Sequence, residues 1–430
     1  MLDRFFKLRE NKTTIKTEVI AGVTTFMTMA YILAVNPDIL SKTGMDKDAL
    51  FTATALSSFV ATLVMALWAR LPFGLAPGMG LNAFFAFTIV LGMGYTWQFA
   101  LAVVFIEGII FILLTAFNIR EAIVNSIPLN LKHAVSSGIG LFIAFIGLSS
   151  AGIIVNNEAT LVSVGDLTSP NAIIAVVGLL IIGILLAFRV KGALLIGIIA
   201  SAIIGIPLGI TKLPDGAWVG GPPSLEPIIG QFDFSNVFTT DMIVVLFTFL
   251  FVDMFDTVGT LVGVSSKANM LDAKGNVPRV KQALFADAIG TTVGAFLGTS
   301  TVTTYVESAS GVAEGGRTGL TSLTVAGMFL LALLFAPVFI MVPSAATAPA
   351  LVIVGLFMMS PMKKINLDDY TESIPAFLTI IMMPLTYSIA EGIAFGMIAY
   401  VLLKLLTGRY KEVSWLMIIL TIFFVLKFIV

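Results

Sequence analysis

TVTTYVESASGVAEGG, residues 301–316, places a strand-like run and two carboxylates inside a very apolar chain. Its first six residues are mostly β-branched or aromatic, which is typical of extended backbone. Glu307 and Glu314 then follow among small residues and glycines. Lipid tolerates neither irregular backbone nor charged groups, unless protein or a water-filled space shields them. We therefore expect this stretch to be enclosed by protein and to face a central cavity.

The composition of the whole chain is that of a protein with many membrane segments. Of its 430 residues, 58% are hydrophobic and 11% are charged, and the mean hydropathy is +1.04. A soluble chain of this length could not bury so much apolar surface. The net charge of −1 gives no nucleic-acid footprint. Without cysteine, and with His133 as its one histidine, the chain is expected to hold no metal and no cofactor.

Apolar runs divide the chain into two sets of seven segments, and a membrane span needs roughly 20 such residues. The first set is 17–36, 49–69, 82–93, 97–117, 133–149, 171–188 and 192–210. The second set is 239–263, 281–298, 308–316, 319–342, 347–360, 372–387 and 390–407. The sequence thus predicts an all-α polytopic membrane protein with about 14 transmembrane segments.

The remaining residues separate and flank the two sets. Residues 1–16 are predicted to be a cytoplasmic N-terminal segment. Residues 211–238 are rich in proline and glycine and are predicted to be an extramembrane linker. The linker divides a first seven-segment repeat, 17–210, from a second, 239–407. The sequence of the apolar tail, 408–430, does not decide whether the tail crosses the membrane, lies in the interface or packs on a neighbour.

The placement of lysine and arginine predicts the orientation. Of 24 such residues, only Lys42, Lys47 and Lys212 fall in loops expected outside, and Lys427 lies in the tail. The other 20 fall on the side of the N-terminus. Cytoplasmic loops carry the excess of positive charge in membrane proteins. This bias predicts a cytoplasmic N-terminus.

An odd number of segments makes the second set start from the opposite side of the membrane. Two such sets form an inverted repeat, which is a common transporter plan with its site at the interface of the repeats. The third segment of each set, 82–93 and 308–316, is short and follows an irregular run. Such paired interruptions indicate a transport site.

Several carboxylates lie within apolar segments, where each costs at least ~2.5–3.5 kcal/mol on insertion scales. Asp253 and Asp256 are three residues apart on one expected helix, and either could serve function or cap a helix break. Glu307 stands where extended backbone becomes helix, either as a site residue or as part of a structural re-entrant loop. Glu314, beside Arg317, fits an ion pair or a role in gating.

Other residues around the two interruptions are expected to support or complete the site. Glu107 and Asp287 each lie in a helix that flanks an interrupted segment. In APGMGLNAFFAF, residues 76–87, Asn82 offers a neutral donor and acceptor. Phe84 could stack on a planar ligand or simply pack.

These stretches resemble purine permeases of the nucleobase–ascorbate transporter (nucleobase–cation symporter-2) superfamily, and in particular the AzgA-like adenine/guanine/hypoxanthine branch. The resemblance covers nearly the whole chain. The matching stretches are AGVTTFMTMAYILAVNP (21–37), APGMGLNAFFAF (76–87), FVDMFDTVGTLVG (251–263) and FADAIGTTVGAFLGTSTVTTYVESASGVAEGGRTGL (285–320). The resemblance implies a core domain from 17–117 and 239–342, and a gate domain from 133–210 and 347–407. It also implies short strands before the half-helices of segments three and ten.

The resemblance further implies that a purine base lies between these strands. The residues expected to bind it are Glu307, Asp256, Tyr305, Val306, Asn82, Phe84, Thr25 and Thr28. The residues expected to carry the proton or support the site are Asp253, Asp256, Glu107, Asp287 and Ser308. Our hypothesis is that Glu307 binds the base while Asp256, with Asp253, carries or tunes the proton; the reverse assignment stays open. The uracil branch has a histidine near its segment-eight acid, and this chain has none, so coupling here must use carboxylates.

The function expected from the resemblance is import of purine nucleobases by proton symport, with an elevator-type or rocking alternating-access mechanism and no enzymatic activity. We expect a multi-pass protein of the bacterial plasma or inner membrane. Its partners would be a purine nucleobase, a proton, lipid and a second copy in a homodimer. An anion transporter of the same fold is the main alternative, although central acids repel anions. An ion channel and an intramembrane enzyme are less consistent with paired broken helices and with two aspartates on one helix.

Overall fold

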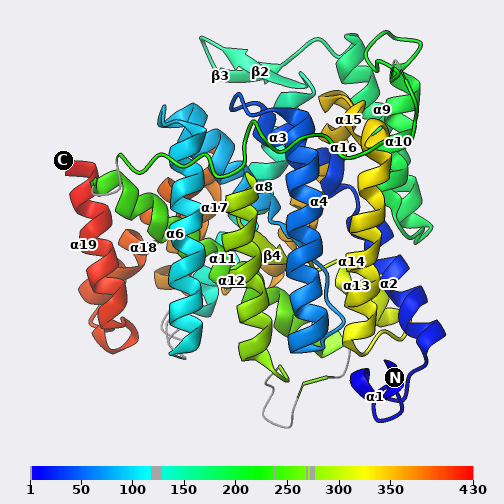
Figure 1. Cartoon of the computed structure of the whole chain (residues 1–430). Coiled ribbons are helices and arrows are strands. Elements are labelled where there is room, and N and C mark those ends of the chain that lie inside the picture. Colours follow the sequence, from blue (N-terminus) through cyan, green and yellow to red (C-terminus); the bar gives the residue numbers. More distant parts are fainter. Residues whose placement is uncertain are drawn as a thin grey trace.

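The chain folds into a bundle of helices whose long axes run roughly together (Figure 1). It is described here by a computed structural model. The residues that the structure describes are 2–117, 128–214, 216–235, 239–267, 270–271 and 277–429. Arg120 and Lys274, counted above among the cytoplasmic charges, lie outside these residues, as do 215 and 236–238 of the predicted linker.

The first half contains long helices on both sides of a short strand. Two helices continue as π-helix, α4 over Met65–Ala69 and α5 over Phe84–Gly92. The elements are α1 (Leu2–Phe6), α2 (Ile15–Met29), α3 (Ile32–Ser41), α4 (Lys47–Val64), β1 (Leu75–Pro77), α5 (Met79–Ala83), α6 (Trp97–Ala116), α8 (Leu129–Ser150), β2 (Ile154–Asn157), β3 (Leu161–Val164), α9 (Pro170–Ala187) and α10 (Ala193–Gly205).

The second half repeats the pattern of a strand followed by a short helix. Its elements are α11 (Thr240–Lys267), α12 (Val280–Leu297), β4 (Val302–Thr304), α13 (Ser308–Ala313), α14 (Gly319–Ala332), α15 (Ala336–Ile340), α16 (Ser344–Met358), α17 (Tyr370–Leu385), α18 (Ile389–Leu406) and α19 (Trp415–Ile429). The predicted short strands are therefore present as β1 and β4, each directly before a short helix.

Nine helices of the described residues are long and apolar enough to cross a membrane. Three shorter apolar helices accompany them, Met79–Gly92, Ala193–Gly205 and Tyr370–Leu385. Each apolar segment expected from the sequence contains a helix. The chain is a multi-pass membrane protein, and the number of segments that cross stays a prediction.

Two features add to the prediction. The first segment, expected as one run over 17–36, is one apolar span, Ile15–Ser41, and a turn at Ala30 and Tyr31 divides this span into α2 and α3. The second feature is the hairpin of β2 and β3, on the face opposite the N-terminus (Figure 1). Asn157 stabilises its turn, because the side chain accepts hydrogen bonds from the backbone of Ala159 and Thr160.

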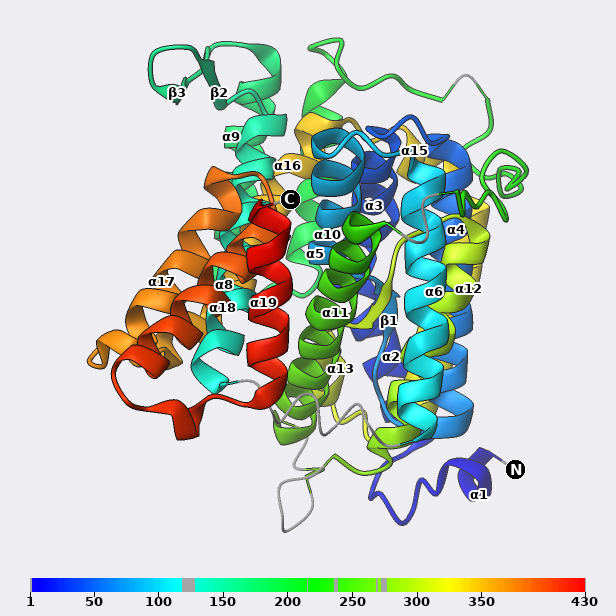
Figure 2. The same ribbon diagram turned by 90° about the vertical axis from the view of Figure 1, so that its left-hand side faces the viewer.

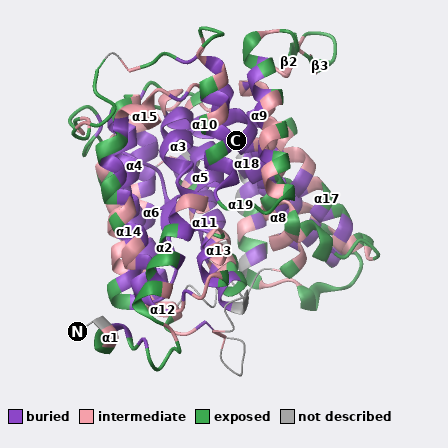
Figure 3. Cartoon of the chain, turned by 90° about the vertical axis from the view of Figure 1, so that its right-hand side faces the viewer, coloured by how far each residue is buried: buried purple, intermediate pink, exposed green. Residues whose placement is uncertain are grey.

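The helices pack in two groups. One comprises α2, α3, α4, α6, α12 and α14, and the other comprises α8, α9, α10, α16, α17 and α18. Helix α11 lies between them and contacts α6 on one side and α18 on the other (Figure 2). Buried residues gather in the interior where the groups meet, while exposed residues mark the outward faces of the bundle (Figure 3).

The apolar tail, whose place the sequence left open, forms helix α19 and packs on α18 and α11. The ring of Phe428 lies 5.4 Å from that of Phe395 in α18. The ring of Phe424 lies 5.8 Å from that of Phe247 in α11. The tail is thus joined to one helix of the second group and to the helix between the groups.

Candidate functional site

The two short strands pair with each other in the interior, although they are more than 200 residues apart. The antiparallel register joins Leu75 to Thr304 and Pro77 to Val302. Hydrogen bonds from Gly78 N to Thr301 O (2.9 Å) and from Tyr305 N to Gly74 O (3.0 Å) extend the ladder at both ends. The pairing satisfies backbone groups that lipid could not satisfy.

A threonine on a neighbouring helix fixes the outer edge of each strand. The hydroxyl of Thr62 in α4 donates to Leu75 O (3.0 Å) and accepts from Leu75 N (2.9 Å). Thr291 in α12 makes the same pair of bonds with the backbone of Val302, at 3.2 Å each. Each hydroxyl therefore replaces a missing strand, and the two halves use the same device.

Glycine is required where β1 meets β4. A Cβ atom on Gly78 would lie 2.9 Å from Thr303 Cγ2 and 3.0 Å from Thr303 Oγ1. This is too close for an ordinary side chain, so Gly78 permits the close approach of the two segments.

Glu307 follows β4 and stands directly before α13, where its side chain makes no capping hydrogen bond to the helix. Its Oε1 accepts a hydrogen bond of 2.8 Å from the hydroxyl of Tyr31, at the break between α2 and α3. The hydroxyl of Thr28 also reaches Glu307 O, at 3.4 Å. The neighbouring Tyr305 turns its hydroxyl the other way and donates to Pro77 O at 2.5 Å. One tyrosine thus holds the carboxylate, while the other braces the strand pair.

Asp256 in α11 faces the same region as Glu307. Its carboxylate is hydrogen bonded to the side chain of Thr303 and interacts electrostatically with Asp287 and Glu307. Behind it, the Thr257 hydroxyl lies 2.7 Å from Asp287 Oδ1 and 3.2 Å from Asp253 Oδ1. Asp253 and Asp287 are fully buried. A chain of acidic groups therefore leads from Asp256 into the protein.

A cavity of about 590 Å³ lies between these groups and the second helix group. Strand β4, α11 and the break at Tyr31 form one wall, and α8 and α16 form the other. Two cations line it, Lys132 in the first turn of α8 and Lys364 at the end of the short helix Ser360–Lys364. The start of α8 lies toward the face that carries the N-terminus (Figure 2). The cavity is therefore acidic at its inner end and basic toward that face.

The structure brings part of the predicted binding set together at this cavity. Asp256, Tyr305, Val306 and Glu307 all line it. Val306 is 49% exposed, although it lies deep in the bundle, because its side chain borders this space.

The other predicted binding residues do not line the cavity. Asn82 is buried and bonds to Ser300 across the strand pair. Phe84 packs edge-to-face on Phe249, with the ring centroids 4.9 Å apart. Thr25 is fully buried, and Thr28 contacts the backbone of Glu307.

The remaining supporting residues surround the strands. Glu107 Oε2 accepts a bond of 2.6 Å from Thr301. The Ser308 hydroxyl accepts from Gly74 N at 3.0 Å. These contacts lie next to the strand pair, and neither residue lines the cavity.

Sequence reasoning missed several residues of this site, namely Tyr31, Thr303 and Thr304 as well as the lining from α8 and α16, such as Ser136, Ile139 and Phe357. Tyr31 lies within a stretch that was singled out, yet nothing in a linear sequence marks a tyrosine that reaches a residue 276 positions away. Thr304 combines deep burial with a hydroxyl that has no partner among the described residues.

One interpretation of the sequence expected an ion pair between Glu314 and its neighbour Arg317, but the structure does not form this pair. Its carboxylate pairs with Lys191 of the α9–α10 connection. Arg317 instead donates to the backbone carbonyls of Val312 (2.6 Å) and Gly316 (2.7 Å). Buried Glu18 accepts from the backbone of Arg317 at 2.9 Å, and so supports the loop before α14.

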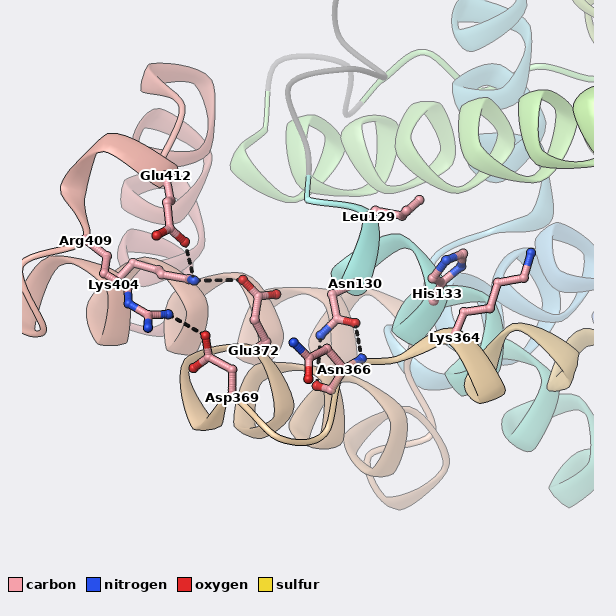
Figure 4. A pocket seen from close by; sticks show the side chains of 10 residues that line it. All are labelled: Leu129, Asn130, His133, Lys364, Asn366, Asp369, Glu372, Lys404, Arg409 and Glu412. Carbon is pink, nitrogen blue, oxygen red and sulfur yellow. Dashed lines mark hydrogen bonds and ion pairs between the residues drawn. The ribbon is translucent and has the colours of Figure 1, made fainter. Parts of the chain in front are cut away.

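A second polar pocket, of about 490 Å³, lies in the second helix group (Figure 4). Lys404 is only 1% exposed, and its Nζ lies 2.8 Å from Glu372 and 2.5 Å from Glu412. Nearby, Arg409 and Thr371 hold the pKa of the Asp369 carboxyl at about 2, below its ordinary value of 3.8. Lys404 thus bridges two glutamates, and Arg409 pairs with Asp369, which indicates a structural network between α17, α18 and the turn before α19.

The chain is similar to known proteins over nearly its whole length. Residues 16–421 match the model of the Permease family, Xan_ur_permease. The chain is 46% identical over 429 residues to the adenine permease AdeP of Escherichia coli, covering 100% of this chain and 96% of the relative. It is also 46% identical over 436 residues to the guanine/hypoxanthine permease PbuG of Bacillus subtilis, covering 99% of each chain.

Among solved structures, the transmembrane domain of the bicarbonate transporter BicA from a cyanobacterium is similar. The TM-score is 0.66 at 16% identity, and the likeness covers 87% of this chain and 97% of that one. At this identity the likeness shows the fold alone.

Proposed function

The chain belongs to the Permease family and is consistent with the nucleobase–ascorbate transporter superfamily, and on this premise we propose that it imports purine nucleobases by secondary active transport. Relatives named as adenine permeases and as guanine/hypoxanthine permeases match it over nearly its whole length. Their names support purine bases as the substrate class. They do not favour one purine over another, because both kinds are equally similar.

The observation that carries the proposal is the meeting of Asp256 and Glu307 at one cavity beside the paired strands. A purine base is neutral, planar and edged with N–H donors. Carboxylate oxygens accept such donors, and a hydrogen bond to a charged group contributes about 1.5–3 kcal/mol. Tyr305 and Phe357 also line the cavity and offer aromatic surface. The inner end of the cavity thus suits a base, whereas its acids repel an anion.

We further propose that the carboxylates couple transport to protons. Asp256 interacts with both Asp287 and Glu307, and Thr257 joins Asp287 to Asp253. Several carboxylates in a low-dielectric interior favour uptake of a cation together with a neutral substrate. In this proposal Glu307 contacts the base, and Asp256 carries the proton with Asp253 and Asp287 behind it.

The two helix groups fit the proposed core and gate domains of an alternating-access transporter. The cavity extends toward the face of the N-terminus, where Lys132 and Lys364 line it. Two contacts between the groups close the opposite face: Lys42 donates to Ser150 (2.8 Å) and Thr347 to Asp38 (2.9 Å). Thr88, in the π-helix after α5, also donates to Tyr387 O (3.3 Å). With a cytoplasmic N-terminus, this is an inward-facing state. We propose that the core group moves against the gate group to expose the cavity on the other face.

The proposal also includes a cell-membrane location with a cytoplasmic N-terminus and a homodimer. The orientation rests on the lysine and arginine bias, and the dimer on the resemblance to permeases that pair through their gate domains. Cross-linking of cysteines introduced on exposed faces of α17 would test the dimer, because the chain contains no cysteine of its own.

The test of the function is uptake of labelled adenine, guanine, hypoxanthine and uracil by a permease-deficient cell that expresses this chain. We expect saturable uptake of at least one purine, little uptake of uracil, and loss of accumulation with a protonophore. A well-expressed protein that takes up no purine would contradict the proposal. Purine uptake that resists the protonophore would contradict only the coupling.

A further inference from the structure

The break in the first membrane segment places a tyrosine at the depth of the paired strands. Helix α2 ends at Met29 and α3 begins at Ile32, so Ala30 and Tyr31 form a turn inside the segment. Tyr31 is 1% exposed, yet it lines the cavity. A break at this depth costs hydrogen bonds that an unbroken helix would make, and the contacts of the turn offset this cost.

The turn brings the Tyr31 hydroxyl to the carboxylate of Glu307. The distance from the hydroxyl to Oε1 is 2.8 Å. One turn earlier, Thr28 reaches the backbone oxygen of the same residue at 3.4 Å. The first segment therefore contacts both the side chain and the backbone of Glu307, across 276 residues of sequence.

A glutamate at a cavity edge would otherwise have several rotamers. The bond from Tyr31 uses one lone pair of Oε1 and restricts the rotation of the carboxylate, so Oε2 stays available to a ligand. Immobilising a flexible side chain before binding removes part of the entropic cost of binding. Phenylalanine at this position would fill almost the same space but could not orient the acid.

The other tyrosine of the cavity does not share this role. The hydroxyl of Tyr305 is bonded to Pro77 O at 2.5 Å, within the strand pair. Thr303 bonds to Asp256 rather than to Glu307. Among the residues that the structure describes, Tyr31 is the one outside the strand segment whose side chain donates to the Glu307 carboxylate.

We propose that Tyr31 is a positioning residue, which holds the Glu307 carboxylate in the orientation that receives the transported base. This proposal rests on the proposed function and deepens it. It assigns the hydroxyl no contact with the base, because its effect acts through Glu307. The first segment thereby takes part in recognition, although none of its predicted residues, Thr25 and Thr28, lines the cavity.

The test compares Tyr31→Phe with Tyr400→Phe. Tyr400 is also buried, at 3% exposed, but it lies in α18 away from the cavity lining. We expect Tyr31→Phe to raise KM for purine uptake on the order of tenfold, because the base must then immobilise the Glu307 side chain on binding. Vmax should stay within about twofold of that of the unchanged protein once surface levels are matched. Tyr400→Phe should leave both parameters unchanged.

A second measurement, of purine binding by purified protein, tests the proposal even if a variant reaches the membrane poorly. The purified full-length variants are heated in detergent with and without a saturating purine. Tyr31→Phe should need about tenfold more base than the unchanged protein for the same shift in melting temperature. The role of Tyr31 would be overturned if the KM of Tyr31→Phe and the purine concentration it needs for the same shift both lie within twofold of the values for the unchanged protein. The proposed function would still stand in that case, provided that the unchanged protein takes up purine. No purine uptake by the unchanged protein would overturn both.

Discussion

Thr347 donates a hydrogen bond of 2.9 Å to Asp38, which joins the start of α16 to the end of α3. Ser344 donates to the same buried carboxylate, and Lys42 bonds to Ser150 nearby at 2.8 Å. These contacts cross between the two helix groups on the face opposite the cavity mouth. They are the contacts that must break if the cavity is to open on that face.

Thr347→Val should weaken this closure, because valine keeps the shape of threonine but cannot donate. The reporter is Ser136→Cys, a cavity position in a chain without cysteine. Labelling by a membrane-impermeant maleimide from the face opposite the N-terminus should rise about 3- to 10-fold with the loss of one such bond. Thr407→Val is the matched control, since that hydroxyl bonds only within its own segment, to Leu403 O at 2.7 Å and Lys404 O at 3.4 Å. Equal labelling in both variants would contradict the closing role.

Glu307→Gln should impair recognition of the base. The amide keeps the size of the side chain but loses the charge that strengthens hydrogen bonds from the base. We expect Vmax/KM for purine uptake to fall roughly 10- to 100-fold. Glu226→Gln is the control, because it removes one acid from the exposed loop before α11. It should leave Vmax/KM unchanged. Full uptake by Glu307→Gln at a normal surface level would remove Glu307 from the binding site.

Asp256→Asn should separate binding from coupling. If Asp256 carries the proton, the variant should still exchange labelled for unlabelled purine across the membrane. It should fail to accumulate purine against a gradient. Counterflow and net uptake in proteoliposomes measure the two activities. Full accumulation of purine by Asp256→Asn would contradict the role of Asp256 as the proton carrier.

The close approach at Gly78 predicts a stability effect. Gly78→Ala places a Cβ about 2.9 Å from the Thr303 side chain, which holds Asp256. Overpacking of this kind costs typically 1–3 kcal/mol. Gly327→Ala in α14 has open space around its Cβ and should leave the melting temperature unchanged or raise it slightly. Equal melting temperatures for both variants in detergent would contradict the strand geometry.

The Asp369–Arg409 pair predicts a pH dependence outside the membrane segments. The carboxyl pKa is lowered from 3.8 to about 2, so the pair stabilises the fold above pH 3.8 and is lost as pH falls through about 2. Asp369→Asn keeps an N-cap for α17 but removes the charge. It should lower the melting temperature slightly at neutral pH, and this difference should shrink as pH falls below 3.8. Asp368→Asn, the neighbouring exposed acid, is the control; a deficit that grows toward pH 2 would contradict the assignment.

Local patterns predicted an extended run at 301–306 and an irregular run before 82–93, but not that the two segments pair. The resemblance implied a base between the strands, whereas the strands are hydrogen bonded to each other. β-branched residues 301–304 and the Pro77–Gly78 pair exclude helix, and a short apolar segment follows each. The family resemblance then pointed to Asp256 and Glu307, which do meet at one cavity. The break at Ala30 and Tyr31 left no such signal, since neither residue opposes helix.

The rest of the site depends on packing between distant segments. Phe84 fits a ligand platform by type, but whether it turns to the cavity or to Phe249 is decided by how α5 lies against α11. The side chain of Asn82 likewise forms a hydrogen bond with Ser300 and does not face the cavity. Glu314 stands three residues before Arg317, yet the fold brings Lys191 to it instead. Contacts of this kind follow from tertiary structure and not from spacing.

We propose that the cavity beside β1 and β4 moves a purine together with a proton. This is tested by uptake of labelled adenine and guanine into proteoliposomes that contain the purified chain, with and without an imposed proton gradient. We expect a purine to accumulate above its outside concentration only with the gradient, and Glu307→Gln to slow the initial rate of this accumulation roughly 10- to 100-fold at low purine concentration. Accumulation that ignores the gradient, or that is as fast in Glu307→Gln as in the unchanged protein, would contradict the proposal.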